Sequence, residues 1–173
     1  ALMHAAQFGH VDVVRLLLGV EGLDRVAFIQ CKILGGQTAL MLAAEGGHVD
    51  VVRLLLDVEG LDRVAYVGRT GLHNETALMR AVEGGHVDVV RLLLDVEGLN
   101  PLDEIQRETR SGRTALMLAV GGGHAQIVRL LLDVEGLDRV AYIQQRNDEG
   151  QTASDLARET GNTDVVALLN EVV

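Results

Sequence analysis

Histidine is the residue type with the broadest chemistry in this sequence, and it recurs at a fixed interval of 38 residues. An imidazole can ligate zinc or act as a general base. Zinc requires each ligand nitrogen about 2.0–2.1 Å from one ion, whereas neighbouring packed helices lie about 8–10 Å apart. We therefore expect these histidines to hold a turn in each copy, and we expect no metal site. They are His10, His48, His86 and His124.

Two other combinations resemble catalytic groups. The H-V-D sequence at residues 48–50 pairs an imidazole with a carboxylate, but it repeats where a helix begins, and there an acidic residue complements the helix dipole. No nucleophile accompanies it. Cys31 is followed by Lys32, which could lower the pKa of the thiol, but a plain exposed or half-buried thiol is the preferred interpretation. We expect no enzyme activity and no cofactor.

The elements that position these residues are themselves repeated. The sequence T-A-L-M begins at Thr38, Thr76 and Thr114, and T-A-S-D begins at Thr152. Each is followed by G-H-V-D-V-V-R-L-L-L or a variant of it. Self-similarity with a period of about 20–50 residues indicates a solenoid. The predicted units are residues 1–34, 35–72, 73–110, 111–148 and 149–173, of which the last is a C-terminal cap.

Each unit predicts two short helices. Thr38 can cap a first helix at residues 39–45, because its hydroxyl can accept a backbone N–H, and the two glycines that follow end it. The second helix, at about residues 49–58, is apolar over most of its circumference and must be covered on both flanks. Gly121 replaces the glutamate of the two preceding units, so we expect the helix from Ala115 to end about a residue earlier.

The pattern T-A-L-M-L-A-A-x-x-G-H-V-D-V-V-R-L-L-L resembles the ankyrin repeat over essentially the whole chain. Two departures are Ala39 for the family's proline and Met41 for its histidine. The resemblance implies an all-α repeat solenoid, an ankyrin-type helix-turn-helix stack with long hairpin-like loops. It also implies a non-catalytic scaffold or adaptor that binds a partner protein through these loops and the concave face of the first helices.

The composition limits the class of partner. A net charge of -10 argues against binding to nucleic acid or to an anionic membrane surface. No apolar run approaches the roughly 20 residues that cross a bilayer. The single cysteine permits no intrachain disulfide, which suits a reducing compartment. We therefore expect an intracellular, cytoplasmic protein with a protein partner.

The copies differ most in the loops, whereas the second helices barely vary. In ankyrin arrays these loops face the ligand, and aromatic residues and arginine are enriched at binding hot spots. The aromatic residues of the loops have a structural alternative, the packing of one loop against the next. The predicted contact residues are Phe8, Phe28, Ile33, Leu34, Tyr66, Arg69, Arg80, Arg107, Arg110 and Arg113.

The first unit lacks the polar substitutions that a terminal repeat should carry. Either an upstream repeat covers its apolar face, or two copies form a homodimer through this uncapped first repeat. Three functions remain open at this point. The chain could be an adaptor, a targeting or regulatory repeat segment of a larger protein such as an enzyme, or a self-associating structural module.

Overall fold

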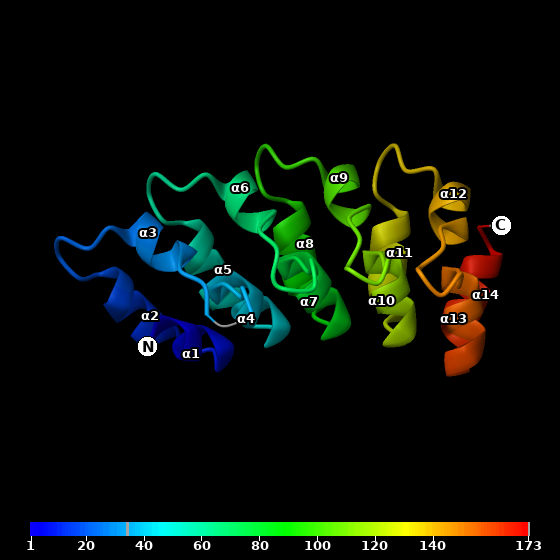
Figure 1. The fold of residues 1–173 in the computed structure, drawn as a ribbon, viewed down its shortest axis with the longest axis horizontal. Coiled ribbons are helices and arrows are strands. Elements are labelled where there is room, and N and C mark those ends of the chain that lie inside the picture. Colours follow the sequence, from blue (N-terminus) through cyan, green and yellow to red (C-terminus); the bar gives the residue numbers. More distant parts are fainter. Residues whose placement is uncertain (34, 173) are drawn as a thin grey trace.

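The computed structural model describes residues 1–33 and 35–172, and this part of the chain forms a row of short helices. Figure 1 shows the units side by side, with the two termini at opposite ends of the row. The first helices of the units are α1 (Leu2–Gln7), α4 (Ala39–Glu45), α7 (Ala77–Glu83), α10 (Ala115–Gly121) and α13 (Ala153–Thr160). The second helices are α2 (Val11–Leu18), α5 (Val49–Leu56), α8 (Val87–Leu94), α11 (Ala125–Leu132) and α14 (Thr163–Asn170).

The threonine caps form as the sequence predicts. The hydroxyl oxygens of Thr38, Thr76 and Thr114 accept the backbone N–H three residues later, at 3.3, 3.3 and 3.4 Å. One expectation about these helices is wrong. Helix α10 continues through Gly121 and is as long as α4 and α7, because the packing around it holds the last turn despite the weaker intrinsic preference of glycine.

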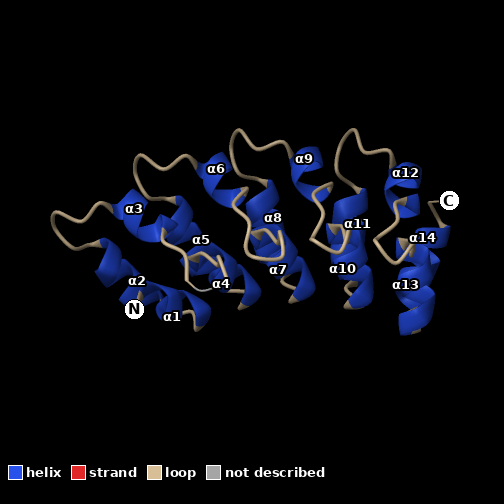
Figure 2. Ribbon diagram, in the orientation of Figure 1, coloured by secondary structure: helices blue, strands red, loops and turns tan. Residues whose placement is uncertain are grey.

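The loops are only partly hairpin-like, which corrects the sequence-based expectation. Each return segment between two units contains a third short helix, visible along the upper edge in Figures 1 and 2. An aspartate caps three of the four, as where Asp62 accepts the N–H of Ala65 at 2.9 Å. Asn100 caps the other. These helices are α3 (Arg25–Gln30), α6 (Arg63–Val67), α9 (Pro101–Ile105) and α12 (Arg139–Gln144).

Hairpin turns occupy the remainder of each return segment, between a third helix and the next first helix. Gly71 donates its N–H to the carbonyl of Glu75 at 2.9 Å, and the later turns repeat this bond. Successive turns are also joined, since the Arg110 N–H donates to the carbonyl of His73 at 2.8 Å. A continuous row of turns therefore runs along the stack and holds the variable residues in fixed positions.

The core lies between the layers of helices and is aliphatic. Leu55 of α5 and Leu93 of α8 are fully buried, and so are Met41, Met79 and Met117 of the first helices. The first helices pack more closely on one another than the second helices do. The stack therefore curves toward the first-helix side, as the ankyrin resemblance implies.

The recurring histidines connect neighbouring units. The Nε2 atom of His48 lies 2.9 Å from the carbonyl oxygen of Gln7, and that of His86 lies 2.8 Å from the carbonyl of Glu45. His124 makes the same contact with Glu83 at 3.1 Å. Each imidazole thus satisfies a backbone carbonyl at the end of the preceding first helix. Its role is structural, but it joins two units rather than holding a turn within one.

The apolar face of the first unit is uncovered in the structure. Val13 of α2 is 47% exposed, whereas its equivalents Val51, Val89 and Ile127 are fully buried against the preceding unit. Leu16 is 73% exposed. Among the helices of the described residues, none has the length and apolar character that crossing a membrane requires.

Candidate protein-binding surface

The ten predicted contact residues do not form one surface. Leu34 lies outside the described residues. Phe8 is exposed at the end of α1, with its ring 4.7 Å from that of His4. Ile33 is exposed in the first hairpin turn. Phe28 is half-buried on α3 and packs against the core.

Tyr66 is not accessible to a partner. It is 1% exposed, and its hydroxyl donates to the carbonyl of Ile29 on α3 at 3.0 Å. Tyr142 is likewise buried, and it donates to the carbonyl of Ile105 on α9 at 2.7 Å. Both tyrosines therefore join consecutive third helices, which is the structural alternative raised for the aromatic residues of the loops. This finding removes Tyr66 from the candidate surface.

Three of the predicted arginines are engaged by other residues of the chain. Arg69 donates to the carbonyl and the side-chain oxygen of Gln30, at 3.3 and 2.7 Å. Arg80 lies 2.7 Å from a carboxylate oxygen of Glu75 and 3.5 Å from one of Glu45. Arg107 forms an ion pair with Glu104. Their guanidinium groups are already held, so a partner would have to compete with these contacts.

Arg110 and Arg113 differ from the other three. Within the described residues, neither guanidinium forms an ion pair with a carboxylate. Arg110 is exposed in the third hairpin turn, and Arg113 is half-buried at the end of the same turn. They are the two predicted arginines that form no ion pair within the described residues.

Two adjoining hollows surround Arg113, and both are also lined by Glu83 and Leu118. One, of about 380 Å³, extends over the hairpin turns to His73, Arg110 and Asp148. We call this pair of hollows the trough.

The second hollow, of about 370 Å³, extends across the first helices. It is bounded by Gly121 and Gly122 at the end of α10 and by Leu156, Glu159 and Thr160 of α13.

The floor and walls of the trough have different chemistry. Leu118 of α10 and Leu156 of α13 are nearly buried, and they form an apolar floor below the charged residues. Arg113 and the carboxylates of Glu83, on α7, and Glu159, on α13, also line the trough. Such a mixture of an apolar base with a few directed polar groups is typical of a recognition site.

Sequence reasoning found both arginines of the trough but missed most of its other residues. Glu83, Leu118 and Glu159 are on first helices, at positions that vary between units or face the concave side. The comparison of equivalent positions along the first helices singles out Glu83 and Leu118 as well as Gly121, but neither was chosen as a contact residue.

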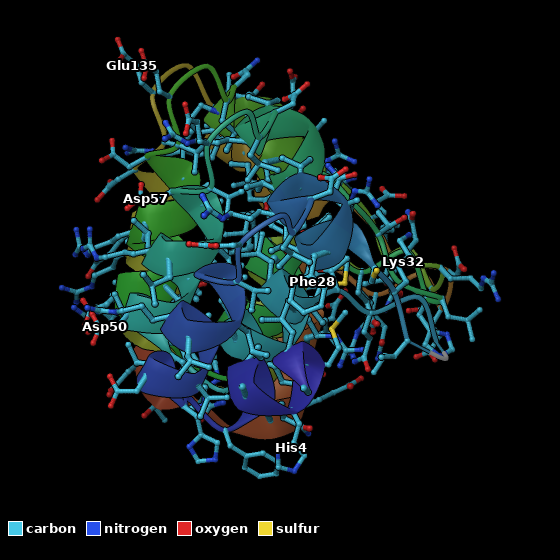
Figure 3. All side chains as sticks on the ribbon, turned by 90° about the vertical axis from the view of Figure 1, so that its left-hand side faces the viewer. His4, Phe28, Lys32, Asp50, Asp57 and Glu135 are labelled. Carbon is cyan, nitrogen blue, oxygen red and sulfur yellow. The ribbon has the colours of Figure 1, made fainter. Side chains whose placement is uncertain are left out.

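A larger hollow, of about 830 Å³, lies on the opposite side of the stack, between α5, α8 and α11. Figure 3 views the stack along its length and separates Asp50 and Asp57, on this second-helix side, from Lys32, beside the hairpin turns. Arg53, Arg91 and Leu92 line the hollow, and their counterparts Arg129 and Leu130 line a similar one in the next unit. This groove therefore repeats with the framework, whereas Arg110 and Arg113 of the trough have no arginine at the equivalent positions of the other units.

No grouping of three or more histidine, cysteine, aspartate or glutamate side chains able to hold a metal ion occurs in the described part of the chain. A sequence model of the family described as Ankyrin repeats (3 copies) matches residues 2–104 and 97–172. A comparison with curated proteins found no match.

Proposed function

Because the chain belongs to the ankyrin repeat family, we propose that it is a non-catalytic scaffold or adaptor that binds a partner protein through the trough and the adjoining hairpin turns. Ankyrin repeats are generally protein–protein interaction modules. The observation that carries the proposal is the trough itself. Its hairpin-turn residues Arg110 and Arg113 differ from their equivalents in the other units, while the residues that build the stack are repeated almost unchanged.

The test compares two triple variants in affinity capture from cell extract. In the trough variant Glu83, Arg110 and Arg113 are replaced by Ala, and in the control Arg53, Arg91 and Arg129 of the second helices are replaced by Ala. Proteins captured by the native chain should be retained by the control and lost with the trough variant. If the captured proteins are instead lost with the control and retained by the trough variant, the binding surface lies on the second helices.

A second candidate function is self-association through α1 and α2. It is favoured by the exposure of Val13 and Leu16, since apolar side chains gathered on one face of a soluble protein mark a contact surface. A two-fold dimer would cover this face in both copies. Sedimentation at increasing concentration should then show a dimer that Leu16→Glu abolishes and that Val140→Glu, at an exposed position of α12, leaves intact. A monomer at every concentration would exclude this function.

The partner proposed here is a protein rather than nucleic acid or a membrane, because the net charge of -10 repels phosphate backbones and anionic lipid headgroups. We place the protein in the cytoplasm, where the free thiol of Cys31 would stay reduced. Fractionation of cells that express the chain, with antibody detection, tests the location. Recovery with the membrane or secreted fraction would contradict it.

A further inference from the structure

The position of Arg113 in the repeat explains why its charge is unpaired. The equivalent residue of the last unit is Gln151, whose side-chain amide donates to both carboxylate oxygens of Glu159, at 2.8 and 3.0 Å. The residue that corresponds to Glu159 in the unit of Arg113 is Gly121. Among the units from the second onward, the chain thus places an arginine at this position only in the unit that lacks the carboxylate.

The position of the Arg113 side chain beside Gly121 agrees with this comparison of the two units. A Cβ atom built on Gly121 would lie 3.8 Å from a terminal guanidinium nitrogen of Arg113, with no other atom that close. The guanidinium therefore lies beside the space that a glutamate side chain would fill. In the preceding unit the equivalent positions hold Glu75 and Glu83, and a different residue, Arg80, lies between the carboxylates of Glu45 and Glu75.

We propose that the space above Gly121 receives an aspartate or glutamate side chain of an extended partner segment, which Arg113 binds through its guanidinium. This inference rests on the proposed function and specifies the chemistry of the partner. A carboxylate bound in this way replaces the intramolecular one that the last unit has. Arginine is suited to it, because its planar fork can donate two parallel hydrogen bonds to one carboxylate.

The residues around this space indicate what the partner segment should carry next to its acidic residue. Leu118 and Leu156 lie beside this space at the floor of the trough, so the residue next to the acidic one should be apolar. Glu83 and Glu159 border the same space. Their negative charges repel a polyanion such as RNA or a multiply phosphorylated segment. The positive charge of Arg113 compensates the negative charge of a single carboxylate beside it.

The experiment uses a phage library of random peptides, panned against the whole chain. Peptides fused to the coat protein through their C-terminus carry no free carboxylate at that end, so any essential acid must be a side chain. We expect the enriched peptides to share one Asp or Glu next to an apolar residue. Synthetic amidated copies are then measured against variants of the chain, all checked for folding by thermal unfolding.

Four variants distinguish the effect of charge from the effect of side-chain size. Arg113→Ala should weaken peptide binding about tenfold or more, the scale of one hydrogen-bonded charge pair. Gly121→Glu supplies the missing intramolecular carboxylate and should weaken binding similarly, while Gly121→Gln, of equal size and no charge, should weaken it less. Replacing the peptide's acid by Lys should abolish binding to the native chain and restore it with Arg113→Glu.

The outcomes distinguish this inference from the proposed function. If peptides bind in the trough but tolerate Arg113→Ala, or lack a shared acid, the carboxylate site is refuted and the binding function stands. If the enriched peptides instead respond to Arg53→Ala and ignore every trough variant, both are refuted.

Discussion

The carboxylate of Glu104 lies 2.8 Å from the guanidinium of Arg107, and the Glu104 side chain is only 2% exposed. Glu104 stands on α9 at the position where Tyr66 and Tyr142 stand on α6 and α12. Each tyrosine hydroxyl donates to a carbonyl of the preceding third helix. An ionised carboxylate has no proton to donate there, and the second oxygen of Glu104 is buried without a hydrogen-bond partner among the described residues.

Burial raises the pKa of Glu104, and the nearby charge of Arg107 only partly opposes this shift. Because the pKa of Glu104 is higher in the folded chain than in the unfolded chain, protonation of Glu104 favours folding at acidic pH. This contribution is complete below the unfolded pKa and is lost as the pH rises through the raised pKa. The joint between the second and third units is therefore weakest when this carboxyl group is ionised.

We expect Glu104→Tyr to stabilise the chain at neutral pH by about 1 kcal/mol or more, the scale for replacing a buried ion pair by a well-packed side chain. Urea unfolding measures the gain, and Tyr142→Phe, which only removes a hydroxyl, gives the value of the hydrogen bond. Glu104→Gln removes the negative charge at nearly the same side-chain size, so it measures the effect of the charge alone. Its stability relative to the native chain should rise as the pH increases from about 4 upward, whereas a constant difference would contradict the titration of Glu104.

Leu55 and Leu93 test whether the second helices are buried on both flanks. Both are fully buried in the middle of their helices, so replacing either by Ala should destabilise the chain by about 2–5 kcal/mol. Leu72→Ala is the control, because Leu72 is exposed in a hairpin turn and its loss should change stability by under about 0.5 kcal/mol. Similar small losses at all three positions would show that the helices are not covered as described.

Replacing Gly85 or Gly60 by Ala distinguishes the cost of backbone strain from the cost of a clash with a histidine. Both have positive φ, +75° and +77°, so Ala at either position should cost about 1–2 kcal/mol in strain. A Cβ on Gly85 would also lie 2.7 Å from Cε1 of His124, whereas nothing lies within 4 Å of one on Gly60. Thermal unfolding should therefore show a larger loss for Gly85→Ala, and this excess should shrink when His124 is also replaced by Ala.

The sequence was sufficient to predict the first and second helices because each has its own local signals. Thr38 and its equivalents supply an N-cap, paired glycines supply a stop, and the apolar pattern between them has the helical period. The role of His48 also followed from its spacing. Helix α6, in contrast, has five residues, which is too short for a periodic pattern. It is held by a contact with another unit, the bond of Tyr66 to Ile29, for which the sequence suggested only the packing of one loop against the next.

The trough was predicted in part for a similar reason. Arg110 and Arg113 were chosen for their residue type, but so were Arg69 and Arg80, which the structure shows to be engaged. Whether a guanidinium is free depends on residues far away in the sequence, such as Gln30 for Arg69. The comparison of Gly121 with Glu159 contained this information, although its meaning required the position of Arg113.

The cap of α6 gives the last prediction. Asp62 accepts the N–H of Ala65, and Asp62→Ala removes this acceptor, which should cost about 0.5–2 kcal/mol. If the loss unravels α6, the amide protons of Tyr66 and Val67 should exchange faster, and those of Leu55 should be affected only through global unfolding. Glu59→Ala, in the same acidic loop but outside the cap, should leave both measurements unchanged. Equal effects of the two substitutions would mean that the loss of negative charge, rather than of the cap, is responsible.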